Sequence, residues 1–193
     1  ILVALFLSFS LFMADKARNL LLANKWDDKT DPTGWWMSEK LDGVRAYWTG
    51  HTFYSRQGNK FTAPKWFTKD LPDSPLDGEL WCGRGLFQKC LSIVKQQKNS
   101  TEAEWKYITY LVFDAPSHGG AYEERVAHLK SHRVPSCGTM CVCACVCVVC
   151  VWWCVCRPPA GLKHLKSTLK DVLKKGGEGI MLRKAKSLYE TCR

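Results

Sequence analysis

The sequence has no apolar run long enough to cross a lipid bilayer. Its longest apolar stretch is residues 1–13, whereas a membrane-spanning helix needs about 20 residues. No Lys or Arg precedes this run, as one would in a secretion signal, and position 1 is not Met. We therefore expect no stable membrane span, and interpret residues 1–13 as an apolar leader, or residues 1–12 as upstream sequence translated ahead of Met13. An intracellular location is favoured, and a secreted or periplasmic location stays open if the leader is a genuine signal.

The composition excludes a chain that is disordered throughout. Apolar residues make up 46% and charged residues 24% of the 193 residues, as in ordinary soluble globular proteins. The formal net charge of +10 favours an anionic partner, although DNA, RNA, an acidic membrane and a nucleotide all qualify. None of the five histidines falls at a metal-ligand spacing, so no histidine-based metal site is expected.

Cysteine is abundant, but its distribution argues against a zinc site. Eight of the 11 Cys lie between Cys137 and Cys156, mostly at alternate positions. Zinc motifs instead place ligands two to four residues apart and then separate the pairs. An alternating TG repeat in the gene would be translated as Cys-Val-Cys-Val. We therefore interpret residues 137–157 as a translated dinucleotide repeat, left by a retained intron or a gene-model error, and keep zinc binding as the less favoured alternative.

The rest of the chain carries both strand and helix patterns. Apolar and β-branched residues predict strands at 35–38, 44–48, 52–55, 76–81, 107–114 and 180–183. Helical spacing of apolar residues predicts helices at 86–98, 122–132 and 162–173. Because strands outnumber helices and do not alternate with them strictly, we expect a mixed α+β domain with largely antiparallel sheets and flanking helices.

The densest group of reactive side chains is Ser38-Glu39-Lys40-Leu41-Asp42-Gly43-Val44-Arg45. Within six residues it offers an amine, a carboxylate and a guanidinium, and Gly43 would let the backbone approach a ligand closely. A Lys is a nucleophile only when deprotonated, so its pKa of about 10.4 must fall through burial or nearby cations. Arg45 or a bound metal ion could supply such a field. Taken alone, the segment is explained at least as well by an exposed loop with solvated charges.

Four further motifs follow this one in the sequence, and together they carry a family resemblance. They are Ser55-Arg56-Gln57-Gly58-Asn59, Leu76-Asp77-Gly78-Glu79-Leu80, Tyr110-Leu111-Val112-Phe113-Asp114 and Glu178-Gly179-Ile180-Met181-Leu182-Arg183. In this order, and after Lys-Leu-Asp-Gly-Val-Arg, they resemble the motifs of the covalent nucleotidyltransferases. These enzymes are the ATP-dependent DNA ligases, the RNA ligases and the messenger-RNA capping enzymes. The longer phrases Trp-Met-Ser-Glu-Lys-Leu-Asp-Gly-Val-Arg-Ala-Tyr-Trp and Leu-Asp-Gly-Glu-Leu-Trp-Cys-Gly-Arg-Gly-Leu-Phe resemble the small bacterial DNA ligases in particular.

The resemblance implies the fold of a nucleotidyltransferase, or ATP-grasp-like adenylation, domain and a covalent reaction. Lys40 would attack the α-phosphate of ATP, expel pyrophosphate and carry AMP as a phosphoramidate. AMP would then pass to the 5′-phosphate of a nick in double-stranded DNA, and the 3′-hydroxyl would seal the nick. We expect the protein to do this as a monomer.

The resemblance also implies roles for the remaining site residues. Asp42 would position the nucleophile or the ribose, and Arg45 would contact the sugar or the phosphates. Glu79 and Glu178 would contact the ribose and coordinate Mg²⁺ or Mn²⁺, because hard cations prefer carboxylate oxygens. Arg56 would hold the 5′-phosphate at the nick, and Phe113 would stack on adenine. By periodicity alone, Phe113 is better explained as a core residue.

The family pattern has two features that the sequence does not contain. Ligases carry a Lys-x-Lys pair in a strand after the Glu-Gly motif, where it grips the α-phosphate, and then an oligonucleotide-binding barrel. Lys184 and Lys186 have the spacing of this pair, but they lie too close to Glu178. We therefore expect residues 14–193 to form an incomplete, C-terminally truncated adenylation domain without the OB-fold domain, interrupted by residues 137–157 and weak or inactive in sealing.

Two other functions stay open. An RNA ligase or a capping-type guanylyltransferase would use the same Lys-x-Asp-Gly-x-Arg motif, but would differ in its nucleotide or in the nucleic acid that it modifies. An inactive fragment that binds DNA or nucleotide would show salt-sensitive DNA binding without a covalent adduct on Lys40.

Overall fold

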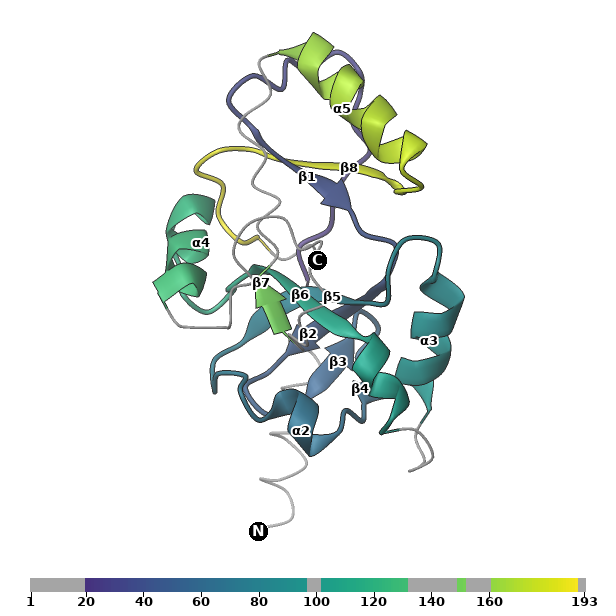
Figure 1. The fold of residues 1–193 in the computed structure, drawn as a ribbon. Helices are drawn as coiled ribbons and strands as arrows, with labels where there is room; N and C mark the ends of the chain where they lie inside the picture. Colours follow the sequence, from purple (N-terminus) through teal and green to yellow (C-terminus); the bar gives the residue numbers. More distant parts are fainter. Residues whose placement is uncertain (1–19, 97–101, 132–148, 152–160, 191–193) are drawn as a thin grey trace.

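The computed structural model describes residues 20–96, 102–131, 149–151 and 161–190. Within these ranges the chain forms a six-stranded sheet and a separate two-stranded sheet, with helices packed against both (Figure 1). The described residues include no helix that is both long and apolar enough to cross a membrane. The mixed α+β class with largely antiparallel sheets, expected from the sequence, is confirmed.

The larger sheet has the strand order β4-β3-β2-β5-β6-β7. Every neighbouring pair is antiparallel except β6 and β7, which run parallel. The β7 strand (Val149–Val151) lies inside the tract of residues 137–157, and the structure describes no other residues of that tract. The strands are β2 (Val44–Trp48), β3 (Phe53–Ser55), β4 (Lys60–Phe61), β5 (Leu76–Trp81), β6 (Thr109–Asp114) and β7 (Val149–Val151).

One face of the larger sheet holds the apolar core. The helices α2 (Lys65–Thr68) and α3 (Phe87–Lys95) and the 3-10 turn η1 (Glu104–Tyr107) contribute to it. Aromatic rings fill its centre, with Phe53 lying 4.8 Å from Tyr110 and Phe67 lying 4.8 Å from Trp105 between ring centroids. The buried Tyr110 hydroxyl donates to the backbone oxygens of Ala46 and Leu76, so this polar group in the core has hydrogen-bond partners.

The opposite face of the same sheet is polar. Successive side chains of a strand alternate between the two faces, and residues directly opposite in an antiparallel pair share a face. Ala46 pairs with Gly78 on the core side, so the next pair, Arg45 and Glu79, points to the polar side. This alternation therefore sends two of the predicted site residues away from the core.

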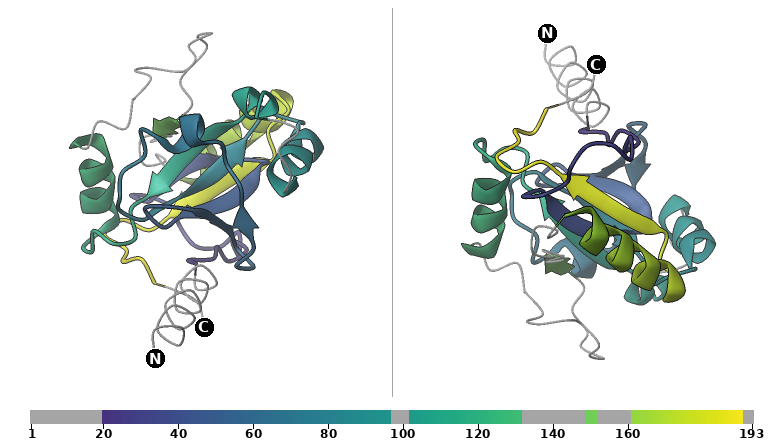
Figure 2. Two further views of the ribbon diagram at one scale, coloured as in Figure 1. Left: turned by 90° about the horizontal axis from the view of Figure 1, so that it is seen from below. Right: turned by 90° about the horizontal axis from the view of Figure 1, so that it is seen from above.

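The smaller sheet consists of β1 (Trp36–Lys40) and β8 (Gly179–Arg183), which pair antiparallel. Helix α5 (Leu162–Lys174) lies over the outer side of this sheet, as the view from above shows (Figure 2). Of its predicted apolar face only Leu165 is fully buried, whereas Leu162 and Leu173 are 38% and 52% exposed. The helix was therefore predicted correctly from its apolar spacing. The described part of the protein, however, covers only part of its apolar face.

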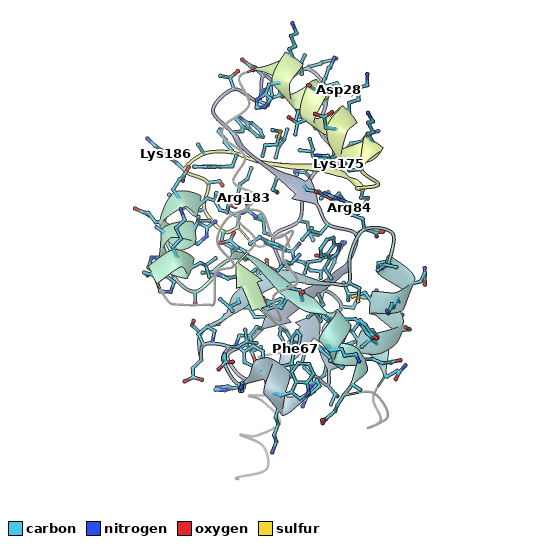
Figure 3. The ribbon with its side chains drawn as sticks, viewed as in Figure 1. Asp28, Phe67, Arg84, Lys175, Arg183 and Lys186 are labelled. Carbon is cyan, nitrogen blue, oxygen red and sulfur yellow. The ribbon has the colours of Figure 1, made fainter. Side chains whose placement is uncertain are left out.

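Polar contacts join the two sheets at the end of β1 that carries Trp36. Helix α4 (Tyr122–Ser131) supplies Arg125, whose guanidinium donates to the buried Asp114 carboxylate, with Nε 2.6 Å from Oδ1. Arg183 of β8 reaches toward the larger sheet (Figure 3) and donates to the same carboxylate over 3.0 Å. The Trp36 indole donates to Glu123 of α4 over 2.6 Å. The partly buried ion pair of Arg183 with Asp114 thus anchors the smaller sheet to the larger one.

The sequence predicted most elements within a few residues. The strands at 44–48 and 76–81 have the predicted bounds, and the helix predicted at 122–132 is observed as Tyr122–Ser131. The short elements β4, α2 and η1 were not predicted. They span two to four residues each, which is too few for a periodic pattern to appear.

Candidate active site

Lys40 lies at the end of β1, and its side chain contacts Glu178. The register places Lys40 opposite Gly179, so the residue before Gly179 meets the Lys40 side chain at the edge of the sheet. The Lys40 amine forms an ion pair with the Glu178 carboxylate, and these side chains are 45% and 40% exposed. The predicted nucleophile is thus held by a predicted metal ligand, at a surface that a nucleotide can reach.

Glu79 lies on β5 in a half-buried position, close enough to Lys40 for the charge of the amine to act on it. Burial raises the pKa of the Glu79 carboxyl to about 8, against the opposing effect of the positive charges of Arg45 and Lys40. A backbone hydrogen bond from Gly43 also favours the charged form. A Cβ atom at position 43 would lie 2.5 Å from the Leu80 oxygen and 2.8 Å from the Glu79 Cγ. The glycine of the first motif therefore lets the link between β1 and β2 press against Glu79.

Arg45 is held by a carboxylate that the sequence prediction did not assign to the site. Its Nε and Nη2 atoms donate to Asp77 over 2.7 and 2.6 Å, and Asp77 is fully buried. The Tyr189 hydroxyl donates to the same carboxylate over 2.6 Å. Asp77 belongs to the Asp-Gly-Glu motif and could have been found there, whereas no sequence pattern pointed to Tyr189.

Phe113 lies on the polar side of the larger sheet and is not part of the buried core cluster. The Arg45 guanidinium carbon lies 4.8 Å from the centroid of the Phe113 ring, a cation–π distance. The alternative drawn from periodicity, that Phe113 is a core residue, is therefore wrong. The structure brings Lys40, Arg45, Glu79, Phe113 and Glu178 to the side of the sheet that faces away from the core.

The two remaining predicted residues lie at the margins of this group. Asp42 is half-buried in the short link between β1 and β2. Arg56 is exposed in the turn that joins β3 to β4. That turn is held by Ser55, whose backbone oxygen accepts from Gly58 over 2.9 Å and whose hydroxyl accepts from the Asn59 N–H over 3.0 Å. The structure thus leaves Arg56 available to an external ligand and does not place it beside Lys40.

The carboxylates of the site fit a metal ion that a nucleotide helps to hold. Among the described residues, no group of three or more His, Cys, Asp or Glu side chains could hold a metal ion alone. Mg²⁺, however, is usually bound by one or two carboxylates together with water and substrate phosphates. Two carboxylates such as those of Glu79 and Glu178 would suffice as the protein's contribution to Mg²⁺ binding, but not to a metal that needs a complete protein cage.

Comparisons with known proteins identify relatives of the chain as a whole. No family model matches the chain. The DNA ligase of Haemophilus influenzae is 35% identical over 157 residues, covering 81% of this chain and 54% of that protein. This chain thus spans about half the length of that curated relative.

Solved structures give the same result. A structure from a study of DNA binding by the minimal scaffold of Lig E DNA ligases matches with a TM-score of 0.74 and 30% identity, covering 90% of this chain and 64% of that one. The adenylated DNA ligase of Chlorella virus matches with a TM-score of 0.64 at 20% identity, covering 88% of this chain and 61% of that one. The second likeness supports the fold alone.

Proposed function

We propose that the chain, which is similar to the ATP-dependent DNA ligases of the small bacterial type, is adenylated by ATP on Lys40 and then passes AMP to a DNA nick. The observation that carries this proposal is the register of β1 against β8, which sets the Lys40 amine beside Glu178. The close contact between Gly43 and Glu79 brings a second carboxylate near the end of β1 that carries Lys40. A cation held by the two carboxylates would supply the positive field that a Lys nucleophile needs in order to lose its proton.

The reaction proceeds in three displacements at phosphorus. The deprotonated Lys40 amine attacks the α-phosphorus and releases one proton, the bond to the bridging oxygen breaks, and pyrophosphate leaves with the bonding electrons. A 5′-phosphate oxygen at the nick then attacks the same phosphorus, and the phosphorus–nitrogen bond breaks to release Lys40. Finally the 3′-hydroxyl attacks the 5′-phosphorus, loses its proton and expels AMP. The nicked double-stranded DNA is thus the second substrate of the proposed reaction.

The other predicted residues bind and orient the substrates in this proposal. Phe113 stacks on adenine with the face that Arg45 does not cover, and Arg45 contacts the ribose or the phosphates. Asp42 orients the region next to the nucleophile. Arg56 holds the 5′-phosphate of the nick, a role that its exposure allows. We propose that a monomer carries out these functions.

Glu79 and Glu178 would hold Mg²⁺ or Mn²⁺ together with the nucleotide phosphates. The bound cation would offset the negative charge that builds up on the phosphate oxygens. In the free chain Glu178 holds the Lys40 amine, so the same carboxylate cannot fully serve the amine and a cation at once. Glu79 is the more buried of the two carboxylates, so we expect its position to change less when the cation binds.

Labelling with α-phosphate-labelled ATP tests the proposal. The full chain should take up label in the presence of Mg²⁺, and the adduct should be acid-labile, as a phosphoramidate is. Lys40→Arg should take up no label, whereas Lys60→Arg, which changes an exposed Lys of β4, should label like the wild type. Label from GTP instead of ATP would favour a capping-type enzyme. No adduct, together with salt-sensitive DNA binding, would favour an inactive binder and overturn the proposal.

A second assay separates DNA from RNA as the acceptor. Purified adenylated chain is mixed with nicked duplexes that carry either a DNA or an RNA strand with a 5′-phosphate. Transfer of labelled AMP to the DNA 5′-phosphate is expected, and preferential transfer to RNA would favour the RNA ligase alternative. Because AMP transfer is read directly, the assay does not depend on completion of the sealing step.

A further inference from the structure

Glu39, the neighbour of Lys40 in β1, is held by an arginine from the loop that follows β5. Successive residues of a strand point to opposite faces, so the Glu39 side chain leaves β1 on the side away from Lys40. Arg84 donates to it twice, with Nε 2.7 Å from Oε1 and Nη2 2.7 Å from Oε2. The Glu39 side chain is only 7% exposed, against 39% for Arg84. A two-point contact of this kind fixes orientation as well as distance.

Arg84 reaches β1 from the loop that follows β5, the strand that carries Glu79. In Figure 3 it lies at the level between the two sheets, above the loop that leads into α3. Gly83 and Gly85, on either side of it, have φ values of 122° and 70°. These conformations are strained for residues with a side chain, so the two glycines shape the loop that presents Arg84.

The Glu39 carboxylate also lies against the segment that leads to Glu178. A Cβ atom at Gly177 would lie 2.7 Å from the Glu39 Oε1. The absence of a side chain at this position therefore makes room for the carboxylate. Glu39 thus contacts the loop after the Glu79 strand and the residue before Glu178, while it is itself the residue before Lys40.

The contact with Arg84 holds one end of β1, and other contacts hold the opposite end. Trp36, at the start of the strand, donates to Glu123, and it pairs in register with Arg183, which donates to Asp114. These anchors lie at the start of β1, and none of them reaches the end where Lys40 pairs with Gly179 of β8. Arg84 supplies the restraint at the end where Lys40 lies.

We propose that Arg84 is a positioning residue, which acts through Glu39 to hold the Lys40 amine beside Glu79 and Glu178. This inference rests on the proposed function, because it concerns the alignment of the same nucleophile. Misplacing a reacting group by about 1 Å can slow a reaction by roughly 100-fold. Arg84 itself is 39% exposed, so water can take its place beside Glu39, which limits the cost of its loss to folding. Loss of Arg84 should therefore appear in the rate of adduct formation and hardly in stability.

The test compares Arg84→Ala, Arg84→Lys, Glu39→Gln and the double variant Arg84→Ala with Glu39→Gln. Lys89→Ala is the control, because it removes a basic side chain from α3 close to the same loop. The single-turnover rate of Lys40 adenylation at saturating ATP, the ATP concentration for half-maximal rate and the thermal midpoint are measured for each. Hydrogen exchange of the amides of residues 36–43 is measured as well, because it reports on β1 without any reaction.

Arg84→Ala should slow adenylation about 10- to 100-fold, with little change in the ATP dependence or the thermal midpoint. Arg84→Lys should recover part of the rate, and the double variant should be no slower than the slower single variant, because both changes break one contact. Exchange should rise toward the Lys40 end of β1, and Lys89→Ala should behave like the wild type.

A wild-type rate in Arg84→Ala would overturn the positioning role and leave the proposed function intact. A fall in the thermal midpoint large enough to explain the lost rate would also overturn it, since Arg84 would then be structural. If the wild type formed no adduct at all, the proposed function would fail first. Unchanged exchange at the Lys40 end of β1 in Arg84→Ala would then reject the restraint itself.

Discussion

Asp77 and Tyr189 are 112 positions apart in the sequence, and the Tyr189 hydroxyl donates a 2.6 Å hydrogen bond to the Asp77 carboxylate. Asp77 is fully buried and also accepts both hydrogen bonds from Arg45. Burial, together with the Asp77 charge, raises the pKa of the Tyr189 hydroxyl, so the hydroxyl stays protonated and remains a donor. The segment after β8 therefore takes part in fixing Arg45 over Phe113.

Tyr189→Phe should weaken the hold on Arg45 without removing it. The buried Asp77 carboxylate would lose one of its donors, and a hydrogen bond to a charged group contributes about 1.5–3 kcal/mol. We expect a fall of this order in the free energy of unfolding and a rise of several-fold in the ATP concentration needed for Lys40 adenylation. Tyr107→Phe, at a residue that is 49% exposed, is the matched control. Unchanged stability and ATP dependence in Tyr189→Phe would contradict the network.

The raised pKa of Glu79 makes stability depend on pH. The folded protein keeps the carboxyl proton up to a pH of about 8, whereas the unfolded chain loses it near the ordinary pKa of 4.5. Between these values the folded state binds more protons, so the free energy of unfolding of the wild type falls as the pH rises. Gln cannot ionise, so Glu79→Gln should gain roughly 1–4 kcal/mol relative to the wild type between about pH 5 and pH 8.

Urea unfolding at several pH values, in the presence of a chelator, measures this difference. The chelator keeps any metal ion from altering the charge of the carboxyl. Glu102→Gln, at an exposed carboxyl, should follow the wild type at every pH. A difference between Glu79→Gln and the wild type that does not change with pH would show that the Glu79 carboxyl has an ordinary pKa.

The local part of this site could be predicted from the sequence, and its tertiary part could not. The strand of Val44–Trp48 was predicted with its bounds, because aromatic and β-branched residues before a Thr-Gly turn define a strand locally. Which carboxylate Arg45 meets depends instead on the register of β2 against β5, which sets it diagonal to Asp77. Arg84 and Glu39 are 45 positions apart, and only the packing of one sheet against the other brings them together.

The Cys/Val tract, residues 137–157, is a second case in which the sequence did not predict a tertiary contact. Its repetitive sequence was interpreted as a translated repeat, and nothing in the pattern predicted a strand at the sheet edge. The structure nevertheless describes Val149–Val151 as β7, paired parallel with β6. Alternating Cys and Val fits extended backbone on β propensity alone, so an available sheet edge is enough to pair with it.

The buried pair of Asp114 and Arg125 should be a main support of the fold. Both side chains are fully buried, and Asp114 also accepts from Arg183. Removing one partner of a buried pair leaves an uncompensated charge and typically costs about 3–5 kcal/mol. Arg125→Ala should therefore lower the free energy of unfolding by about this amount, as measured by urea unfolding. Lys130→Ala, on the exposed side of the same helix, should change it little. A small effect of Arg125→Ala would mean that Arg183 and the Ala115 N–H together satisfy Asp114.

Gly43→Ala adds only one methyl group, but it should slow the adenylation of Lys40 markedly. The added methyl would lie 2.5 Å from the Leu80 oxygen and 2.8 Å from the Glu79 Cγ, closer than Cβ atoms are found to lie. Because Leu80 is paired with Val44 in the sheet, the backbone oxygen cannot retreat cheaply, and the link from β1 must move instead. Since that link begins at Lys40, adenylation should slow by about tenfold or more, while overpacking costs about 1–3 kcal/mol of stability.

A control must separate this close approach from the general cost of replacing a glycine. Gly119 has a φ of 71° and open space around it, so Gly119→Asn, which tolerates that conformation, should leave adenylation unchanged. If Gly43→Ala also adenylated Lys40 at the wild-type rate, the methyl would have been accommodated without moving the link. The nucleophile would then not depend on contact between Gly43 and Glu79, and Arg84 would be the main restraint on its position.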